Sequence, residues 1–410
     1  MQKKKLIVIG GGAAGFFCAV NAASKDLDVV ILEKTHKILS KVKVSGGGRC
    51  NVTHSCFSIA DMVKNYPRGN KFLKESFHHF FTTDTINWFA AKGVRLKTEA
   101  DGRMFPESNS SQTIIDCLMH EANKNHIDIL LNSDVEKISV GQDKQFVVLL
   151  KNGSQMTADL VCVACGGYSK EHQYKLISDL GHSLENPVPS LFTFNIPGNA
   201  IVQLTGISID NAIIKLNGTK FSQHGPVLIT HWGLSGPAIL KLSSFAAREL
   251  AQVQYDFSIS VNWLNDFNET SLIKKLTQLR IDDAAKKIIN RNPFLLPQRF
   301  WEYQLQLSNI DKDLRWADLS SKQQNALAKL LCSQQFEIKG KTTFKEEFVT
   351  AGGIRLNEIN ASTMQSRVVS NLFFAGEIMD IDGITGGYNF QHAWTSGYLA
   401  AKEIQKIAAG

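Results

Sequence analysis

The sequence predicts an α/β protein in which one domain, formed by both ends of the chain, is interrupted by a long insertion. Three observations predict this fold class. A glycine-rich turn joins an apolar strand to a helix near residue 10. A second strand, near the C-terminus, ends in Gly376-Glu377 and is followed by another helix. Strand and helix patterns alternate at both ends, whereas the middle is rich first in strands and then in helices, which indicates a discontinuous domain.

The first 33 residues have the order strand, glycine turn, helix, strand and acid. An apolar run at 6–9 precedes the spacing G-x-G-x-x-G, which begins at Gly10. A helical pattern follows, then a second apolar run at 29–32, and then Glu33. This order is typical of the Rossmann-like dinucleotide-binding unit. An ordinary parallel sheet with a glycine-rich turn is the alternative interpretation.

Each part of this unit has a physical role. Gly10 permits the tight turn, Gly12 lets a pyrophosphate approach the backbone, and Gly15 lets the helix pack closely on the strand. The helix N-terminus offers free N–H groups and the positive end of a dipole to phosphates. Glu33 can accept hydrogen bonds from an adenosine ribose and disfavours a 2′-phosphate there. The motif alone does not choose between a nicotinamide and a flavin dinucleotide.

Hydrophobic periodicity predicts the remaining elements. Residues 34–56 are polar and glycine-rich. The expected helices are 71–92, 112–123, 269–280, 284–290, 298–307, 321–331 and 390–407. The expected strands are 127–131, 135–140, 145–151, 155–164, 213–216, 227–229, 255–261 and 336–346.

These patterns divide the chain into segments. The nucleotide-binding domain takes 1–189 and 349–410, a β-rich insertion takes 190–265 and 335–348, and a helical insertion takes 266–334.

Composition is ordinary for a globular protein: 410 residues, 43% hydrophobic, 20% charged and a formal charge of +7. The lysines are scattered, so we expect no nucleic-acid partner. The apolar run after Lys3–Lys5 is too short for a signal peptide, and no stretch is long enough to span a membrane. The sequence therefore predicts a cytoplasmic protein without membrane association, and its oligomeric state is not predicted.

The seven cysteines are dispersed, as is typical of reduced thiols. Cys162 and Cys165 form a C-x-x-C, but they lie in a strand pattern, where positions three apart point to opposite faces. A dithiol redox role is therefore disfavoured. No second pair at zinc-finger spacing occurs, so no metal site is expected.

The C-terminal segment favours a flavin. A carboxylate at a strand end, Glu377, can hold a hydroxyl of a ribityl chain. A helix N-terminus just beyond it can stabilise negative charge on the N1 and O2 atoms of a reduced flavin. A nicotinamide enzyme has no such requirement. The alternative is a further strand–turn–helix of the sheet, with Glu377 as a helix cap.

Five motifs, together with the N-terminal fingerprint, carry a resemblance that covers almost the whole chain. They are SGGGRCNVT (45–53), GRMFP (102–106), THWGLSGPAIL (230–240), VTAGGI (349–354) and FFAGEIMDIDGITGGYNFQHAWTSGYLAA (373–401). The chain resembles the BaiN/RdsA-like family of bacterial FAD-dependent oxidoreductases, also called YhiN-like or aminoacetone-oxidase-like. The resemblance implies FAD in a discontinuous Rossmann-like domain, with an insert made of a β-barrel-like part and a helical part.

The resemblance also implies which residues contact FAD. The expected contacts of the N-terminal segments are Gly10, Gly12, Ala13, Ala14, Gly15, Glu33, Lys34, Lys41, Ser45, Gly46, Gly48, Arg49, Cys50, Asn51, Val135, Ala164 and Gly166. Those of the C-terminal segment are Gly376, Glu377, Asp382, Gly386, Gly387, Tyr388 and Asn389. The chain departs from the family pattern in three places: His54 replaces a usual Asn, Cys165 replaces a usual Thr, and residues 168–174 replace a longer glycine-rich stretch.

Two side chains are candidates for catalysis. His231 can act as an acid or base facing the flavin, or it can fix a turn through hydrogen bonds. Arg49 can pair with pyrophosphate or an anionic substrate, or it can form a surface ion pair. Cys50 is either a redox thiol beside the flavin or a small packing residue.

The predicted function is that of an FAD-dependent oxidoreductase acting on a small organic substrate. Reduction of a C=C bond, with NAD(P)H as a transient electron donor, and amine oxidation by O₂ both stay open. The alternative is a flavin-binding redox sensor or RNA-modification subunit. An enzyme that uses NAD alone is disfavoured by the Gly376-Glu377 segment.

Overall fold

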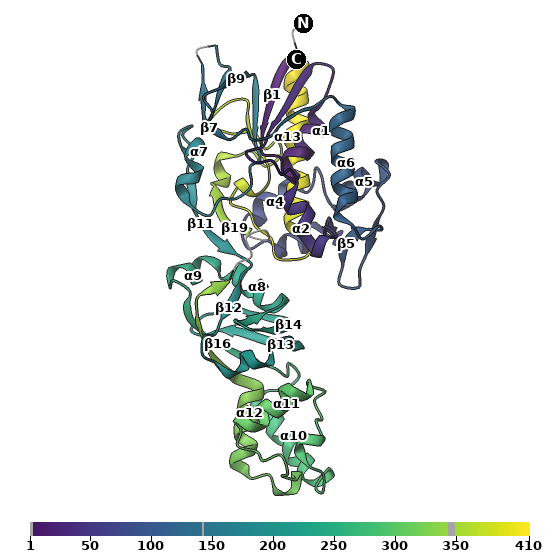
Figure 1. Ribbon diagram of the computed structural model, residues 1–410, viewed down its shortest axis with the longest axis vertical. Helices are drawn as coiled ribbons and strands as arrows, with labels where there is room; N and C mark the ends of the chain where they lie inside the picture. The colour runs from purple at the N-terminus through teal and green to yellow at the C-terminus, as the bar shows by residue number, and fades with distance from the viewer. Residues whose placement is uncertain (1–2, 142, 343–348) are drawn as a thin grey trace. The chain divides into compact units, whose positions relative to one another are not determined.

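The computed structural model describes residues 3–141, 143–342 and 349–410. The chain divides into two compact units, each described here by itself. Unit 1 consists of residues 1–190 and 344–410, and unit 2 consists of residues 191–343. Both chain ends, purple and yellow in Figure 1, belong to unit 1. This confirms the discontinuous fold class.

A parallel sheet lies at the centre of unit 1. Its strand order is β20-β10-β1-β2-β6, and all neighbouring strands run parallel. These strands are β1 (Lys4–Ile9), β2 (Leu27–Leu32), β6 (Asp128–Leu130), β10 (Leu160–Val163) and β20 (Leu372–Phe374). All four residues of β10 are buried, as expected where helices cover both faces of a parallel sheet.

Two helices from opposite ends of the chain pack together beside this sheet. They are α1 (Ala13–Ala22) and α13 (Tyr388–Ala409), drawn in purple and yellow in Figure 1. Gly397 allows their close approach, because a Cβ atom there would lie 2.7 Å from the carbonyl oxygen of Ala14. The C-terminal helix is therefore an integral part of the domain.

The other elements of unit 1 form small sheets and short helices around this centre. The small sheets have the orders β3-β5-β4, β7-β8-β9 and β11-β19. Their strands are β3 (Thr53–His54), β4 (Leu96–Thr98), β5 (Arg103–Pro106), β7 (Val135–Val140), β8 (Phe146–Leu150), β9 (Gln155–Ala158), β11 (Leu184–Ser190) and β19 (Val349–Ile354). The helices are α2 (Ser40–Gly48), α3 (Ile59–Met62), α4 (Asn70–Ser76), α5 (Thr82–Ala91), α6 (Ser111–Lys124) and α7 (Lys175–Ser178).

Two helix predictions are wrong. The expected helix 71–92 is broken into α4 and α5, because the Asp84 carboxylate accepts a hydrogen bond from the Phe81 N–H (2.7 Å) and starts a new helix there. The expected helix 284–290 has only a 3₁₀ turn at its end, Ile288–Asn290. Here the Lys287 backbone forms a bridge with Arg315 instead of continuing a helix.

Unit 2 contains a sheet with the order β17-β16-β13-β14-β15-β12-β18. Its strands are β12 (Thr193–Asn195), β13 (Ser208–Leu216), β14 (Ser222–Thr230), β15 (Gly233–Ser235), β16 (Asp256–Asn262), β17 (Gln334–Lys339) and β18 (Lys341–Thr342). Only Gly340 separates the two edge strands: its N–H donates to Tyr255 and its carbonyl accepts from Asn195. The sheet thus curves towards closure, but the described strands form no closed barrel. The expected strand 336–346 extends past residue 342, beyond the described residues.

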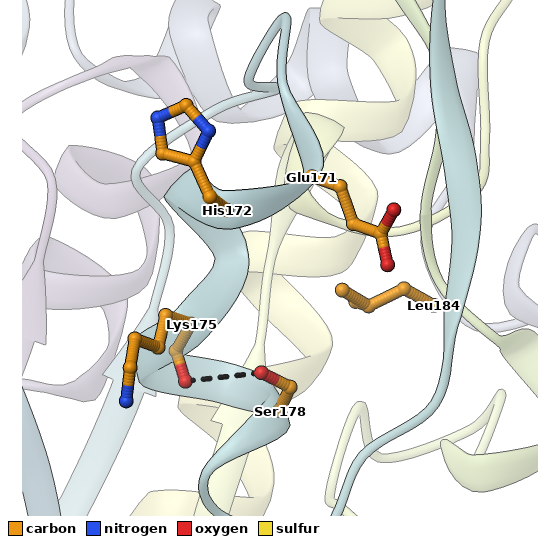
Figure 2. A pocket seen from close by; sticks show the side chains of 5 residues that line it. All are labelled: Glu171, His172, Lys175, Ser178 and Leu184. Atoms are coloured by element: carbon orange, nitrogen blue, oxygen red, sulfur yellow. Dashed lines mark hydrogen bonds between the residues drawn. The ribbon is translucent and has the colours of Figure 1, made fainter.

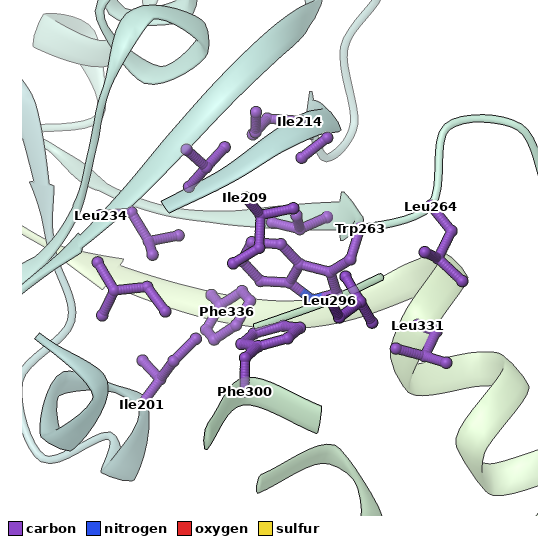
Figure 3. Close-up of a cluster of buried hydrophobic side chains, with 14 of the residues drawn as sticks. Ile201, Ile209, Ile214, Leu234, Trp263, Leu264, Leu296, Phe300, Leu331 and Phe336 are labelled. Carbon is purple, nitrogen blue, oxygen red and sulfur yellow. The ribbon is translucent and has the colours of Figure 1, made fainter. Parts of the chain in front are cut away.

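The helices of unit 2 share one apolar core with its sheet. They are α8 (Pro237–Phe245), α9 (Ala247–Gln252), α10 (Glu269–Asp282), α11 (Gln298–Leu307) and α12 (Ser321–Ser333). Figure 3 shows Trp263, which follows β16, close to both Phe300 of α11 and Phe336 of β17. The Trp263 ring centroid is 4.9 Å from that of Phe300 and 6.1 Å from that of Phe336. The β-rich and helical segments of the insertion are therefore packed together.

Candidate functional site

The candidate site lies at the carboxyl edge of the parallel sheet. Ile9 is the register partner of both Leu32 and Val163, and Val163 is the partner of Phe374, so four strands end at the same level. The residues just beyond these ends include Gly10, Glu33, Ala164 and Gly376. In open α/β sheets, this edge is where ligands bind.

The glycine turn after β1 has the geometry that its sequence predicts. Gly10 has φ +115°, and a Cβ there would lie 2.5 Å from the Ala164 carbonyl oxygen. A Cβ at Gly15 would lie 2.0 Å from the Gly10 carbonyl oxygen. A Cβ at Gly12, by contrast, would meet no atom within 4 Å. Gly10 and Gly15 are therefore required by the fold, whereas Gly12 leaves open space that a phosphate could use.

The N-terminus of α1 is free to bind an anion. Gly12 is its N-cap, so no side chain caps the helix, and the first intrahelical bond runs from the Phe16 N–H to the Gly12 carbonyl (3.0 Å). Ala13 and Ala14 belong to the first turn, whose N–H groups have no partner within a helix. These groups suit the negative charge of a phosphate.

Glu33 is held beside the glycine turn. Its Oε2 accepts a hydrogen bond from the Gly11 N–H, and its Oε1 accepts one from the Thr35 N–H, both 2.9 Å long. Its carbonyl accepts from the Ser133 N–H (2.8 Å), shortly before Val135 begins β7. The structure thus brings the expected ribose ligand and the start of β7 to the same end of the sheet.

The segment around α2 bends at its glycines. Ser45 leaves the helical conformation, and Gly46, Gly47 and Gly48 have φ between 58° and 84°. A Cβ at Gly46 would lie 2.8 Å from the Phe105 ring, whereas one at Gly47 or Gly48 would meet nothing within 4 Å. The bend therefore leaves open space at residues 47–48, next to the expected cofactor contacts.

Arg49 and Cys50 are placed by packing and by an ion pair. The Arg49 guanidinium lies 4.0 Å from the centre of the Phe105 ring and donates to Glu99 (2.5 Å). Cys50 is fully buried, and burial raises the pKa of its thiol to about 12. A reactive thiolate is therefore disfavoured at Cys50, and the Arg49 role in catalysis stays a prediction.

The two ends of the chain meet at the N-terminus of α13. The Asn51 side-chain oxygen accepts a hydrogen bond from the Gly387 N–H (2.9 Å). His54 stacks on Tyr388, with ring centroids 5.0 Å apart and planes 19° from parallel. A Cβ at Gly386 would lie 2.8 Å from the Tyr388 ring. Four of the predicted contacts and the unusual His54 therefore form one cluster.

Asp382 and Asn389 brace the loop between β20 and α13. Asp382 is fully buried, where its two carboxylate oxygens accept from Nε and Nη2 of Arg68 and one of them also accepts from Ser190 Oγ (2.6 Å). Burial raises the pKa of this carboxyl, although Arg68 opposes the shift. The Asn389 amide bonds to both the N–H and the carbonyl of Gly383 (2.8 and 2.9 Å). These contacts support the loop itself.

Glu377 is the centre of a second polar group at the sheet edge. Its Oε2 accepts from Lys41 Nζ (2.6 Å), and its Oε1 accepts from the Thr350 N–H (2.8 Å). A Cβ at Gly167 would lie 2.6 Å from Thr350 Oγ1, so Gly167 contacts this group through its backbone. Gly166 has φ +78° and open space beside it. Thr350 was not among the predicted residues, although it lies in the VTAGGI motif.

The turn at Gly376 is fixed by α13. Ser396 Oγ accepts from the Gly376 N–H (2.9 Å), and His392 Nε2 lies 3.2 Å from the Gly376 carbonyl oxygen. Burial lowers the pKa of His392 to about 4. Sequence reasoning missed both residues, and their spacing of one helical turn was the available signal.

The structure places His231 in unit 2, whereas every predicted FAD contact belongs to unit 1. His231 is exposed, follows β14 and packs edge-on against Trp232 (4.3 Å between ring centroids). Lys34 is also exposed, with its Nζ 5.4 Å from the Tyr168 ring. The acid–base role of His231 stays a prediction.

Other types of site are not supported by the described residues. Cys162 is buried beside Cys18, and hydrogen bonding and burial raise its thiol pKa well above the usual range. No group of His, Cys, Asp and Glu side chains within the described ranges could hold a metal ion. No helix in the described part of the chain has the length and apolar character to cross a bilayer.

A surface hollow of about 500 Å³ lies over α7 and β11. Figure 2 shows the lining side chains, with Ser178 Oγ bonded to the Lys175 carbonyl (3.2 Å). The other lining residues are Glu171, His172 and Leu184. None of the predicted FAD contacts lines it, so this hollow is a separate feature.

The residues at the sheet edge fit FAD. An uncapped helix N-terminus and the open space at Gly12 suit the pyrophosphate, and Glu33 suits the ribose. At the other end, Thr350 Oγ1 is buried without a hydrogen-bond partner in the described structure, as expected of a group that faces a ligand. The fold and this site define a flavoprotein oxidoreductase with a Rossmann-like FAD-binding domain.

The chain belongs to the HI0933-like family: the model described as HI0933-like protein Rossmann domain matches residues 4–403. It is 30% identical over 413 residues to a ribosomal RNA dihydrouridine synthase of Escherichia coli, covering 98% of both chains. It is 28% identical over 408 residues to a 3-dehydro-bile acid delta(4,6)-reductase of Clostridium scindens, covering 96% of this chain and 97% of that protein. The predicted family is thereby confirmed.

A solved structure shares the fold. The open conformation of a flavocytochrome c3 fumarate reductase aligns with a TM-score of 0.51 and 17% identity, covering 100% of this chain and 79% of that one. At this identity the likeness concerns the fold alone.

Proposed function

We propose that this FAD-dependent oxidoreductase reduces a carbon–carbon double bond conjugated to a carbonyl group, with NAD(P)H as the electron donor. The observation that carries the cofactor part of the proposal is the pair of polar groups, around Glu33 and Glu377, at one sheet edge. The reaction itself is supported by two relatives. The names of the two relatives describe the same kind of chemistry, since dihydrouridine forms by saturation of a uracil double bond.

The residues of unit 1 would hold the cofactor and set its charge. Gly12 and the first turn of α1 would bind the pyrophosphate, and Glu33 would bind the ribose. Lys41 neutralises Glu377 at the opposite end, and the N-terminus of α13 would stabilise negative charge on the reduced flavin. Bound FAD supplies the hydride transfer. Amine oxidation by O₂ has less support, because neither relative is named for it.

The substrate is either a small molecule or a uracil in ribosomal RNA. The dihydrouridine synthase supports the second candidate and the bile acid reductase supports the first, and each matches this chain over nearly its full length. Most of the formal charge of +7 also falls in residues 191–343, a distribution that suits a phosphate backbone. These observations weigh against our expectation that no nucleic acid is involved.

The test uses the full chain, purified and supplied with FAD. We expect a yellow protein that NADPH or NADH bleaches without oxygen. A conjugated enone, or an unmodified ribosomal RNA transcript, should then restore the flavin absorbance, whereas amines should not bleach the oxidised protein. The RNA product should gain two hydrogens on one uridine. The proposal fails if the chain binds no FAD, or if double-bond acceptors reoxidise it no faster than buffer.

A further inference from the structure

Thr350 is the second residue of β19 and is fully buried. Its register partner in β11 is Pro189. The Thr350 N–H donates a hydrogen bond to Glu377 Oε1 (2.8 Å). This bond fixes the Thr350 side chain beside the turn that follows β20.

The Thr350 hydroxyl has no hydrogen-bond partner in the described structure. It faces the backbone of Gly167, where any Cβ would lie 2.6 Å from Oγ1. A buried hydroxyl without a partner is costly, and native proteins usually provide one. A valine would fill the same volume without that cost, so the hydroxyl at this position requires an explanation.

A second element brings another unpaired polar atom to the same turn. His392 of α13 lies with Nε2 at the Gly376 carbonyl, and its buried Nδ1 has no hydrogen-bond partner among the described residues. Thr350 and His392 therefore flank the Gly376-Glu377 turn from β19 and α13. Two such atoms at a turn already suited to a flavin indicate a ligand with polar atoms of its own.

We propose that Thr350 is a flavin-binding residue whose hydroxyl forms a hydrogen bond to FAD. This inference rests on the proposed function and adds a residue to the cofactor site. Glu377 orients Thr350 through its backbone N–H, and Gly167 leaves room for the hydroxyl. The Thr350 side chain would thus recognise the cofactor directly, while the Glu377 carboxylate stays paired with Lys41.

The test compares FAD binding and thermal unfolding of the full chain in four forms: wild type, T350V, T350S and T82V. Thr82 is the matched control, because its hydroxyl is also buried and without a partner in the described structure, but it lies in the first turn of α5. Without FAD, T350V and T82V should both melt a few degrees higher, since each removes an unpaired hydroxyl.

FAD binding should separate these variants. T350V should bind FAD about 5- to 10-fold more weakly, as expected for the loss of one hydrogen bond. T350S and T82V should stay within about twofold of wild type. The inference fails if T350V binds FAD as tightly as wild type, or if T82V weakens binding equally. A wild-type chain that binds no FAD overturns the proposed function as well.

Discussion

The two units differ in the structural constraint that limits their residues: backbone geometry in unit 1 and side-chain packing in unit 2. In unit 1, the site depends on backbone geometry: a Cβ at Gly10 or Gly15 would lie 2.5 Å or less from a carbonyl oxygen. In unit 2, the shared core depends on packing between apolar side chains such as Trp263, Phe300 and Phe336. Backbone constraints restrict a position to one residue type, whereas packing accepts many apolar combinations. The difference explains why short sequence motifs are readable in unit 1, whereas unit 2 offers only apolar patterns.

The largest expected change in the free energy of unfolding comes from removing a buried side chain of unit 2. Trp263→Ala should lower the free energy of unfolding of unit 2 by about 4 kcal/mol, because it empties a fully buried site between strands and helices. FAD affinity should not change, since the predicted contacts belong to unit 1. Urea unfolding and FAD titration measure the two effects. Ile281→Ala, at a 70% exposed residue of α10, is the control and should change neither.

The next largest loss of stability is expected from adding a side chain where the backbone of unit 1 is closely packed. Gly15→Ala should destabilise unit 1 by about 3 kcal/mol, because its Cβ would lie 2.0 Å from the Gly10 carbonyl oxygen. Calorimetry of the full chain without FAD should show this loss. A variant as stable as wild type would contradict the role of backbone geometry in unit 1.

The stability of unit 1 should fall at acid pH because His392 becomes protonated on unfolding. Burial lowers the pKa of His392 to about 4, against about 6.5 when unfolded, so the unfolded chain binds the proton first. Stability is therefore highest above pH 6.5 and falls by about 2 kcal/mol between pH 7 and pH 5. Urea unfolding at both pH values checks this. His392→Gln should remove the loss of stability that is due to His392. If the variant keeps the pH dependence of wild type, the role of His392 is contradicted.

The smallest expected effect is at Gly12, where a substitution should weaken FAD binding without changing the stability of the fold. Gly12→Ala should unfold at the same temperature as wild type, because a Cβ at Gly12 meets no atom within 4 Å. It should nevertheless weaken FAD binding by about tenfold, since that open space is where the pyrophosphate would approach. FAD titration with a thermal melt of the same sample tests both statements. Equal FAD affinity would show that the pyrophosphate lies elsewhere.

Local signals were sufficient for the elements whose geometry is set by nearby residues. The turn at Gly10, the parallel strands β1 and β2, and the helix after them follow from residue types within one short segment. The predicted helix 298–307 coincides with α11 because its apolar positions follow the helical period. These features were predictable from sequence alone.

Features that depend on contacts between distant segments were not predictable. The break in the expected helix 71–92 is a different kind of miss, because Asp84 and Phe81 are only three residues apart and the apolar spacing masked this local cap. The burial of Thr350 next to Gly167 and Glu377 exists only once β19 and β20 are in place. No short-range pattern indicates such a contact, so Thr350 became a candidate only in the structure.

The antiparallel pair of β11 and β19 has a consequence for the architecture. Ser190 is the last residue of unit 1 before the insertion, Val349 is the first described residue of unit 1 after it, and the two are register partners. A short turn joining them would complete an ordinary β-hairpin. The pairing of β11 with β19 therefore lies within the cofactor unit, and the length and sequence of the segment inserted between these two strands can vary without breaking that pair.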